Sequence, residues 1–170
     1  MKKLIIGATG SIGSALSRKL VSQGKQVHLV GRNESETSAL ANELNSTFTV
    51  ADVLTENYSD QIISDVGDID GLAFCVGSID LKPIRLSKKS DYMQSFNLNL
   101  ISATEIIRAC HEKLKSNKGS IILFSTVAAK RGFLNHSIIS SAKAAVDIIP
   151  KQLAETTATA KALNKLLRIK

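Results

Sequence analysis

The 170-residue chain has no tryptophan, and aromatic residues make up only 4% of it. A chain so poor in aromatic rings offers few surfaces on which nucleic-acid bases stack. Its two cysteines, Cys75 and Cys110, have neither disulfide-framework nor metal-ligand spacing, which indicates packing residues in a reducing compartment. No apolar run reaches the length of a membrane-spanning helix, and the first residues lack the apolar core of a signal peptide. We therefore expect a cytoplasmic protein without a metal site, membrane segment or nucleic-acid partner.

The net charge of +7 is unevenly distributed along the chain. Residues 151–170 carry five basic groups against one acid, so this short segment holds +4 of the total. A basic terminal helix is more often a solvated face than a binding site for a polyanion. We expect residues 1–150 to form a single domain and residues 151–170 to be its basic, helical C-terminal extension.

Short apolar runs alternate with helical patterns along most of the chain. Such alternation predicts an α/β fold, a doubly wound parallel sheet covered by helices on both faces in a Rossmann-like three-layer arrangement. A ligand then binds at the carboxyl ends of the strands, where the strand order reverses. The clearest helix follows residue 97, where the spacing of apolar residues indicates a core or interface stripe. The expected strands lie near 3–7, 27–31, 47–51, 70–76 and 120–125, and the expected helices near 12–23, 35–45, 55–66, 97–116 and 137–150.

A glycine-rich turn, Gly7-Ala8-Thr9-Gly10-Ser11-Ile12-Gly13, separates the first expected strand from the first expected helix. Glycine permits positive φ and lets a ligand approach the backbone closely. The helix that follows offers free N–H groups and a partial positive charge to a pyrophosphate. A simple tight turn is the alternative, but the strand before and the helix after favour a nucleotide site. The residues expected to bind the cofactor here are Gly7, Thr9, Gly10, Ser11, Ile12 and Gly13.

The second expected strand ends at Gly31-Arg32-Asn33, where a dinucleotide-binding enzyme distinguishes between its two cofactors. An acidic residue here binds ribose hydroxyls, whereas arginine binds a 2′-phosphate through charge-assisted hydrogen bonds. One hydrogen bond to a charged group contributes about 1.5–3 kcal/mol. Arg32 therefore predicts a preference for NADP(H) over NAD(H) of roughly 10- to 150-fold. An ordinary exposed loop arginine is the alternative.

With these motifs in order, the chain resembles the short-chain dehydrogenase/reductase family from about residue 3 to residue 149. Asp52 and Val53 look like the pair that contacts the adenine ring at the end of the third strand. Of the family's segment after the fourth strand, this chain keeps only the glycine, Gly77, which is expected to bind the cofactor. Asn99 looks like the second asparagine of a segment in which this residue holds a water and kinks the helix. The resemblance implies catalysis on a small-molecule carbonyl or alcohol with NAD(P)(H).

The catalytic tyrosine of the family is missing from this chain. In the family it lies four residues before the active lysine, and counting back from Lys143 gives Ile139. The family's serine lies thirteen residues before that tyrosine, which here is Thr126. A threonine hydroxyl still suits a substrate carbonyl, and Lys143 still suits the nicotinamide ribose, because its three donors match vicinal hydroxyls. We expect Asn99, Thr126 and Lys143 to support catalysis.

Two side chains are candidates for the missing proton donor. His136 lies three residues before Ile139 and carries an imidazole, a common general acid, and Tyr92 precedes the helix that carries Asn99. A loop histidine is more often structural, and water is a further source of the proton. General acid–base catalysis typically contributes 10²- to 10⁴-fold, roughly, so the loss of the phenol leaves slow hydride transfer open.

The family's sixth strand, substrate-covering segment and seventh strand are not recognisable after the expected lysine helix. Pro150 predicts a kink or break there, because proline removes a donor and clashes with the preceding turn. The chain is then naturally short, a fragment or incompletely represented. The resemblance also implies a homodimer or homotetramer formed through helices 97–116 and 137–149.

Three interpretations of the function follow. The first is an NADP-preferring short-chain oxidoreductase with an atypical proton donor. The second is a dinucleotide-binding sensor or assembly subunit without turnover, which the missing phenol favours. The third is a basic binding module whose glycine turn is only structural, and it has the least support because several nucleotide motifs occur together.

Overall fold

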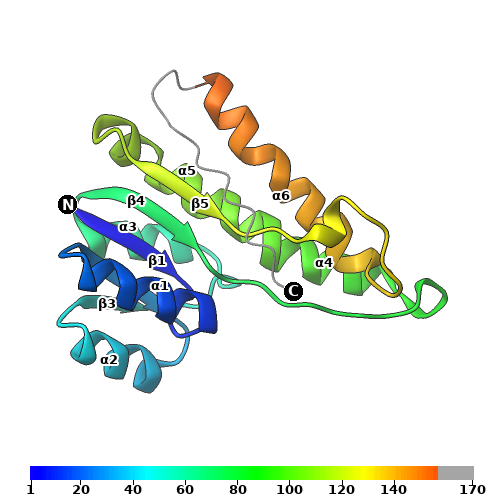
Figure 1. The fold of residues 1–170 in the computed structure, drawn as a ribbon, viewed down its shortest axis with the longest axis horizontal. Helices are drawn as coiled ribbons and strands as arrows, with labels where there is room; N and C mark the ends of the chain where they lie inside the picture. The colour runs from blue at the N-terminus through cyan, green and yellow to red at the C-terminus, as the bar shows by residue number, and fades with distance from the viewer. Residues whose placement is uncertain (157–170) are drawn as a thin grey trace.

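The computed structural model describes residues 1–156 of the chain. Their strands form one parallel sheet in the order β3-β2-β1-β4-β5, and helices pack on both of its faces (Figure 1). This confirms the expected α/β fold. The strands are β1 (Lys2–Ile6), β2 (Gln26–Gly31), β3 (Thr47–Val50), β4 (Ile69–Phe74) and β5 (Ser120–Leu123). The α-helices are α1 (Ser11–Ser22), α2 (Glu34–Glu43), α3 (Tyr58–Val66), α4 (Lys89–Phe96), α5 (Ser102–Ser116) and α6 (Ser137–Thr156).

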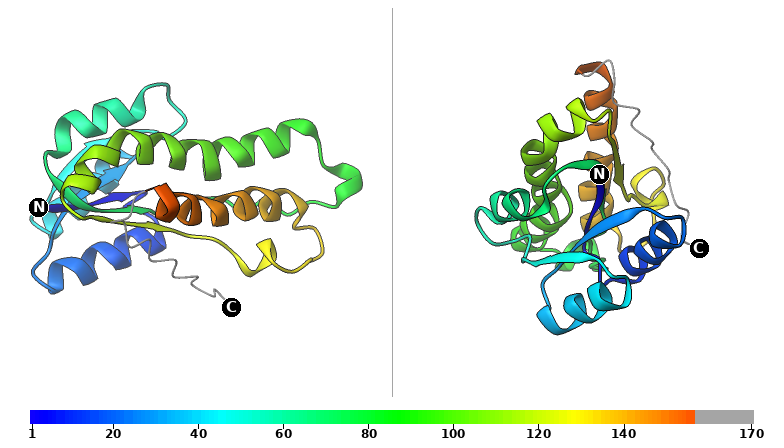
Figure 2. Two further views of the ribbon diagram at one scale, coloured as in Figure 1. Left: turned by 90° about the horizontal axis from the view of Figure 1, so that it is seen from above. Right: turned by 90° about the vertical axis from the view of Figure 1, so that its left-hand side faces the viewer.

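The central strand β1 divides the core into two clusters. Successive side chains of a strand point to opposite faces, so Leu4 and Ile6 pack with α3, α5 and α6, whereas Ile5 packs with α1 and α2. Figure 2 shows α3 and α5 on one side of the sheet and α1 on the other. The apolar stripe expected on the helix after residue 97 belongs to the first cluster and is therefore core. Its buried members are Ala103, Ile107, Cys110 and Leu114.

The topology places one edge of the sheet where a ligand is expected. β1 pairs with β2 on one side and with β4 on the other, so the strand order reverses beside β1. All strands run parallel, and the segments that follow their carboxyl ends therefore meet at one edge. Crevices at such a reversal are the ordinary ligand site of open α/β sheets.

The helix expected to begin near residue 97 begins earlier, at Lys89. α4, a π-helical turn η2 (Asn97–Ile101) and α5 follow one another without a gap. The sequence of α4, KSDYMQSF, buries only Ser95 and has no apolar stripe, which explains why the pattern missed it. Single π turns inside α-helices are frequent at functional sites, and this one contains Asn99.

The break expected at Pro150 does not occur, because α6 continues through it to Thr156. An interior proline costs about 3 kcal/mol of helix stability. Pro150 is itself buried, and Val146, Ile149 and Leu153 pack on the core around it, so burial offsets that cost. The described part of the expected extension, 151–156, prolongs α6, and 157–170 lie outside the described residues. In residues 1–156, no helix is both long and apolar enough to cross a membrane.

Candidate functional site

Two glycines of the turn between β1 and α1 are required by the fold itself. Gly7 has φ +77°, and a Cβ there would lie 2.8 Å from Val76 Cγ2. A Cβ on Gly13 would lie 2.2 Å from the Gly7 carbonyl oxygen, closer than any side chain tolerates. The N–H groups of Gly7 and Ala8 both donate to the Val30 carbonyl at 2.9 Å, which fixes the turn against β2. Tight packing of the turn therefore accounts for both glycines.

Gly10 is different, because the protein leaves room for a side chain there. A Cβ on Gly10 would meet only the Gly7 carbonyl oxygen, at an ordinary 3.5 Å. Gly10 is the N-cap of α1, no side chain caps this helix, and its first turn carries no acidic residue. The first N–H groups of α1 have no partners within the helix, and they carry its positive end. Glycine at this position keeps open a cradle that fits an anionic diphosphate.

The segments after β2 and β3 lie beside the glycine turn. A Cβ on Gly31 would approach Thr9 Cγ2 to 3.3 Å, and the Ala51 N–H donates to the Gly31 carbonyl at 3.0 Å. Arg32 follows Gly31 directly and is exposed at this edge. Asp52 is also exposed, and its Oδ1 accepts the Leu54 N–H at 2.9 Å. The Val53 side chain is buried in the larger core cluster.

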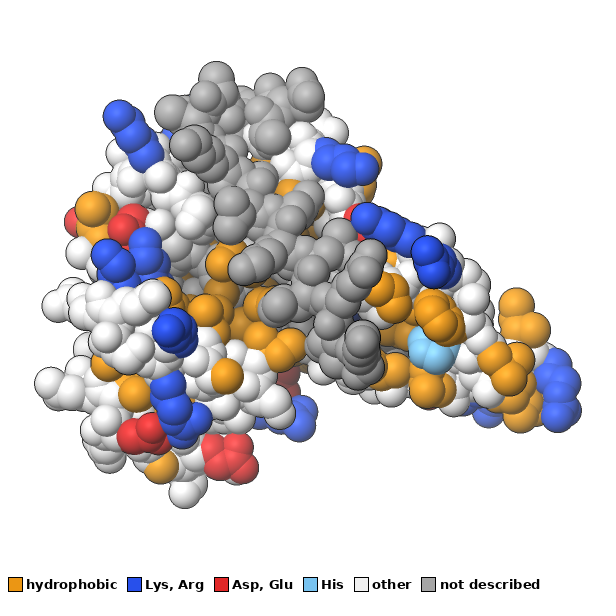
Figure 3. Space-filling model, viewed as in Figure 1, with side chains coloured by type: hydrophobic (Ala, Val, Ile, Leu, Met, Phe, Trp, Pro, Cys, Tyr) orange, Lys and Arg blue, Asp and Glu red, His pale blue; other side chains and the backbone are white. Residues whose placement is uncertain are grey.

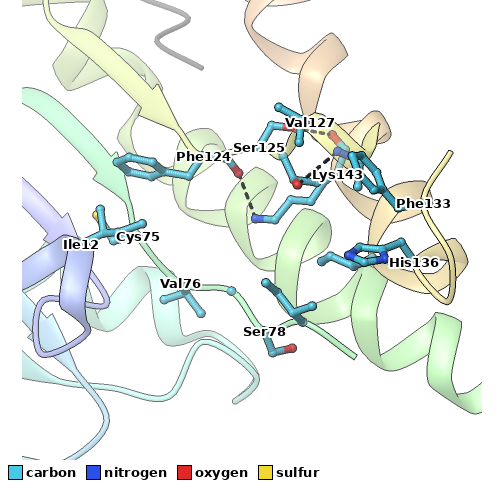
Figure 4. A pocket seen from close by; sticks show the side chains of 15 residues that line it. Ile12, Cys75, Val76, Ser78, Phe124, Ser125, Val127, Phe133, His136 and Lys143 are labelled. Carbon is cyan, nitrogen blue, oxygen red and sulfur yellow. Dashed lines mark hydrogen bonds between the residues drawn. The ribbon is translucent and has the colours of Figure 1, made fainter. Parts of the chain in front are cut away.

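A cavity of about 410 Å³ lies beyond the carboxyl ends of β1, β4 and β5 (Figure 4). It brings together four of the expected site residues, Ile12, Gly77, Thr126 and Lys143, with Ile139 and His136. On the face shown in Figure 3, hydrophobic side chains gather in the hollow between α1 and the start of α6. Residues that complete the lining are Cys75, Val76, Ser78, Ile79, Phe124, Ser125, Val127, Ala128 and Phe133.

Both the side-chain amine and the backbone carbonyl of Lys143 are hydrogen-bonded to residues that follow β5. Its Nζ donates to the Phe124 carbonyl at 3.0 Å, and its own carbonyl accepts from Ser125 Oγ at 3.2 Å (Figure 4). Burial lowers the pKa of the amine to about 8, while the charge of Asp147 opposes that shift. A Cβ on Gly77 would lie 3.4 Å from this Nζ, so glycine lets the chain after β4 approach the amine.

Asn99 lies behind Gly77 and is 1% exposed. Its Nδ2 donates to the Ser95 carbonyl at 2.9 Å, across the π-helical turn. Its Oδ1 is buried without a hydrogen-bond partner among the described residues, and a Cβ on Gly77 would come within 3.0 Å of it. A buried carbonyl group of this kind needs a donor. Asn99 is thus a positioned acceptor next to the cavity rather than part of its lining.

The position at which the resemblance places a tyrosine is occupied by hydrocarbon. Ile139 lies one helical turn before Lys143, lines the cavity and is 2% exposed. Thr126 keeps a hydroxyl at the cavity, although its Oγ1 also accepts the Ala128 N–H at 3.3 Å at the start of the 3-10 helix η3 (Val127–Ala129).

The two candidate proton donors are placed differently. His136 lines the cavity, and its Nδ1 lies 2.7 Å from the Leu134 carbonyl. Since a carbonyl only accepts, Nδ1 carries a proton and Nε2 is the nitrogen left to exchange one. The Tyr92 hydroxyl lies 3.0 Å from Ser137 Oγ, and Tyr92 is not among the residues that line the cavity. The structure therefore brings His136, and not Tyr92, to the cavity.

The sequence did not predict that the Phe124 carbonyl holds Lys143, or that Ile79 and Phe133 form apolar walls of the cavity. A backbone carbonyl leaves no trace in side-chain patterns, and Ile79 and Phe133 are far from each other in sequence. The signal for these walls lay in apolar residues after the fourth and fifth expected strands. Among the described residues, no three His, Cys, Asp or Glu side chains are arranged to hold a metal ion.

Known proteins share this chain's sequence pattern and fold. L-xylulose reductase of Bos taurus is 28% identical over 156 residues, which cover 90% of this chain and 64% of that protein. The 3-oxoacyl-[acyl-carrier-protein] reductase of Rickettsia bellii is 29% identical over 160 residues, which cover 92% and 66%. The chain thus spans about two thirds of the length of these curated relatives.

Solved structures agree with the fold. A short chain dehydrogenase/reductase family protein superimposes with a TM-score of 0.90 at 22% identity, over 95% of this chain and 71% of that one. The KRED1-Pglu enzyme superimposes with a TM-score of 0.88 at 19% identity, over 95% and 71%. The model of the short chain dehydrogenase family matches residues 2–163. The chain belongs to the short-chain dehydrogenase family.

Proposed function

We propose that this chain binds NADP(H) at the carboxyl edge of its sheet and interconverts a small carbonyl compound and its alcohol. The observation that carries the proposal is the cavity that joins Ile12 of the glycine turn to Thr126 and Lys143. The nicotinamide, when bound, supplies or accepts the hydride. Relatives named as reductases of L-xylulose and of a 3-oxoacyl group support a carbonyl as the substrate class.

The cofactor residues of the proposal follow the edge of the sheet. Free N–H groups at the start of α1 and the open space at Gly10 suit the diphosphate. Lys143 suits the nicotinamide ribose. The full set is Gly7, Thr9, Gly10, Ser11, Ile12, Gly13, Arg32, Asp52, Val53, Gly77 and Lys143.

A preference for NADP(H) over NAD(H) is proposed from Arg32. Its side chain is exposed beside the glycine turn and the end of β3, where the adenosine ribose is expected. No acidic residue stands at the end of β2 to bind ribose hydroxyls and repel a phosphate. A 2′-phosphate there gains charge-assisted hydrogen bonds that a hydroxyl does not.

For the chemical step, the Thr126 hydroxyl donates a hydrogen bond to the substrate oxygen. Asn99 and Lys143 hold the residues around the cavity in position. Ile139 has no proton to give, so His136 Nε2 or water supplies it. A phenol contributes roughly 10²- to 10⁴-fold by acid–base catalysis, and the proposed turnover is slower by a factor of this order.

Ile139 also favours a second candidate function, a dinucleotide-binding sensor or assembly subunit without turnover. A buried hydrocarbon in place of the proton donor preserves the cofactor cradle and removes the acid. The two candidates differ in one measurable property, because only the oxidoreductase consumes NADPH.

The test is a panel of aldehydes, ketones and alcohols assayed by NADPH or NADP⁺ absorbance, with Lys143→Ala as the matched control. Turnover above that control supports the oxidoreductase. Tight NADPH binding without turnover above the control rejects it in favour of the sensor.

A homodimer or homotetramer is proposed as well, formed through residues 97–116 and 137–149. Ile101 and Ile148 support this assignment, because they are exposed apolar side chains on these two segments. Light scattering on the purified chain tests it, and a monomer at micromolar concentration would reject it. A reducing compartment such as the cytoplasm is proposed from the free thiols of Cys75 and Cys110.

A further inference from the structure

The amine of Lys143 stands in surroundings that suit covalent chemistry with carbonyl compounds. We propose that Lys143 is a nucleophilic amine that condenses with a small apolar aldehyde or ketone entering the cavity, forming an imine. This reaction needs no dinucleotide, so it is independent of the proposed oxidoreductase function. It makes the cavity a covalent carbonyl-binding site.

The walls around the amine are the first argument. Ile12, Val76, Phe124 and Ile139 line the cavity, and none of its described lining residues is a carboxylate. A cation against such walls loses part of its hydration and has no carboxylate within the cavity lining, which favours the neutral amine. Apolar walls also select the apolar part of a carbonyl compound.

The charges that face Lys143 give the second argument. Asp147, one turn further along α6, is the opposing charge that raises the pKa of the amine. From α4, Asp91 is paired with Lys82 at 2.8 Å and Tyr92 contacts Ser137. The packed segments η2 and η3 contain no titratable side chain. Burial therefore outweighs Asp147.

The balance of these effects fixes how much nucleophile is present. Burial lowers the pKa of Lys143 to about 8. About a tenth of the amine is then neutral at pH 7, against less than about a thousandth for a lysine of ordinary pKa. The nearby thiol of Cys75 does not compete, because burial raises its pKa to about 12.

His136 supplies the proton transfer that the condensation requires. The lone pair of the neutral Nζ attacks the carbonyl carbon, a C–N bond forms, and the carbonyl π electrons move to oxygen. The C–O bond then breaks as oxygen leaves as water with the two protons that nitrogen loses, and C=N forms. Since Nδ1 donates to the Leu134 carbonyl, His136 Nε2 is the nitrogen that takes a proton from Nζ and passes it to the leaving oxygen. No oxidant or reductant takes part.

The first test traps the imine in the full chain without nucleotide. Butanal and cyanoborohydride are added at pH 7, and butylation of each lysine is followed by peptide mass mapping. Exposed Lys25 is the internal reference. We expect Lys143 to be butylated at least about tenfold faster than Lys25, with a rate that levels off above about pH 8. Equal or slower butylation of Lys143 would overturn the proposal.

Two variants separate the causes. Asp147→Asn removes the opposing charge, and we expect butylation of Lys143 at pH 7 to rise about two- to fivefold, with its pH midpoint shifted down. Asp60→Asn, on the exposed face of α3, is the matched control and leaves the rate unchanged. His136→Gln slows butylation at Lys143 without moving the midpoint. If neither Asp147→Asn nor His136→Gln changes the rate, the amine does not react in this cavity and the proposal fails.

Adding NADPH distinguishes this inference from the proposed function. Protection of Lys143, with Lys25 unaffected, supports both. Fast butylation of Lys143 that NADPH does not slow keeps the reactive amine and rejects the proposed contact of Lys143 with the nicotinamide ribose. Slow butylation together with tight NADPH binding rejects the reactive amine and keeps the cofactor site.

Discussion

At the residue scale, the chemistry of the cavity depends on one side chain. Ile139 lies one turn before Lys143 and against the same cavity, at the position where the proposed reaction lacks a phenol. The surrounding groups keep their places, since Lys143 is fixed by the Phe124 carbonyl and Asn99 by the Ser95 carbonyl. The proposed defect is thus confined to the proton donor.

Restoring the phenol should restore catalysis. We expect Ile139→Tyr to raise NADPH-dependent carbonyl reduction by roughly 10²- to 10⁴-fold, the usual contribution of a positioned general acid. Ile139→Phe adds the same ring without the hydroxyl and serves as the control, with no gain expected. Steady-state rates on the carbonyl panel make the comparison, and equal rates for the two variants would refute a purely local defect.

Arg32 is tested by the difference between two nucleotides. Arg32→Ala should weaken NADPH binding by roughly 10- to 150-fold and NADH binding far less, because only NADPH carries the 2′-phosphate. Lys25→Ala removes the same charge at the opposite end of β2 and should change neither affinity. Calorimetry measures both. Equal losses for NADPH and NADH would reject the phosphate contact.

At the element scale, different glycines of the turn between β1 and α1 serve folding and cofactor binding. Gly13 is needed for packing, whereas Gly10 has room for a side chain. The turn is fastened to β2 through the Val30 carbonyl, so its geometry belongs to the sheet. One element therefore supplies a matched pair of substitutions.

Gly13→Ala should destabilise the fold by more than about 2 kcal/mol, because its Cβ would overlap a backbone oxygen. Gly10→Ala should cost less than about 1 kcal/mol, yet abolish NADPH binding by filling the cradle. Urea unfolding and NADPH titration of both variants provide the measurements. Unchanged NADPH affinity in Gly10→Ala contradicts the cradle.

The pairing of β2 with β3 contains a buried histidine. His28 Nε2 lies 2.9 Å from Thr49 Oγ1, and that hydroxyl donates to Asp65 at 2.9 Å. Thr49 therefore accepts from Nε2–H, and Nδ1 accepts from Thr47 Oγ1 at 2.8 Å. Burial lowers the pKa of His28 to about 4, with Lys2 adding to the shift. The network is built for a neutral imidazole.

This network should make stability depend on pH. The unfolded chain takes up the proton near pH 6.5 and the folded chain only near pH 4, so the stabilisation is full above pH 6.5 and falls as pH drops to about 4. The total change is about 3 kcal/mol. Urea unfolding at pH 7.5 and 4.5 measures it. In His28→Gln, the share of the pH dependence of the unfolding free energy that is due to this residue should vanish. An unchanged pH dependence in this variant would contradict the assignment.

At the scale of the whole molecule, the sequence predicted the parallel sheet because each strand is an apolar run followed by a helical pattern. It did not predict α4, whose residues are polar, nor the continuation of α6 through Pro150, which depends on tertiary packing. The glycine turn and Lys143 were recognisable as motifs, but the Phe124 carbonyl and the distant apolar walls became neighbours only through folding.

The edge of the sheet unites these features, because the ends of all its strands meet there. The central claim is that this edge binds NADP(H), with the diphosphate at the start of α1 and a 2′-phosphate at Arg32. The most direct test is a calorimetric titration of the purified chain, at moderate salt, with NADPH and separately with NADH. The account predicts saturable binding of NADPH that is roughly 10- to 150-fold tighter than that of NADH. Binding of neither nucleotide, or equal binding of both, would contradict it.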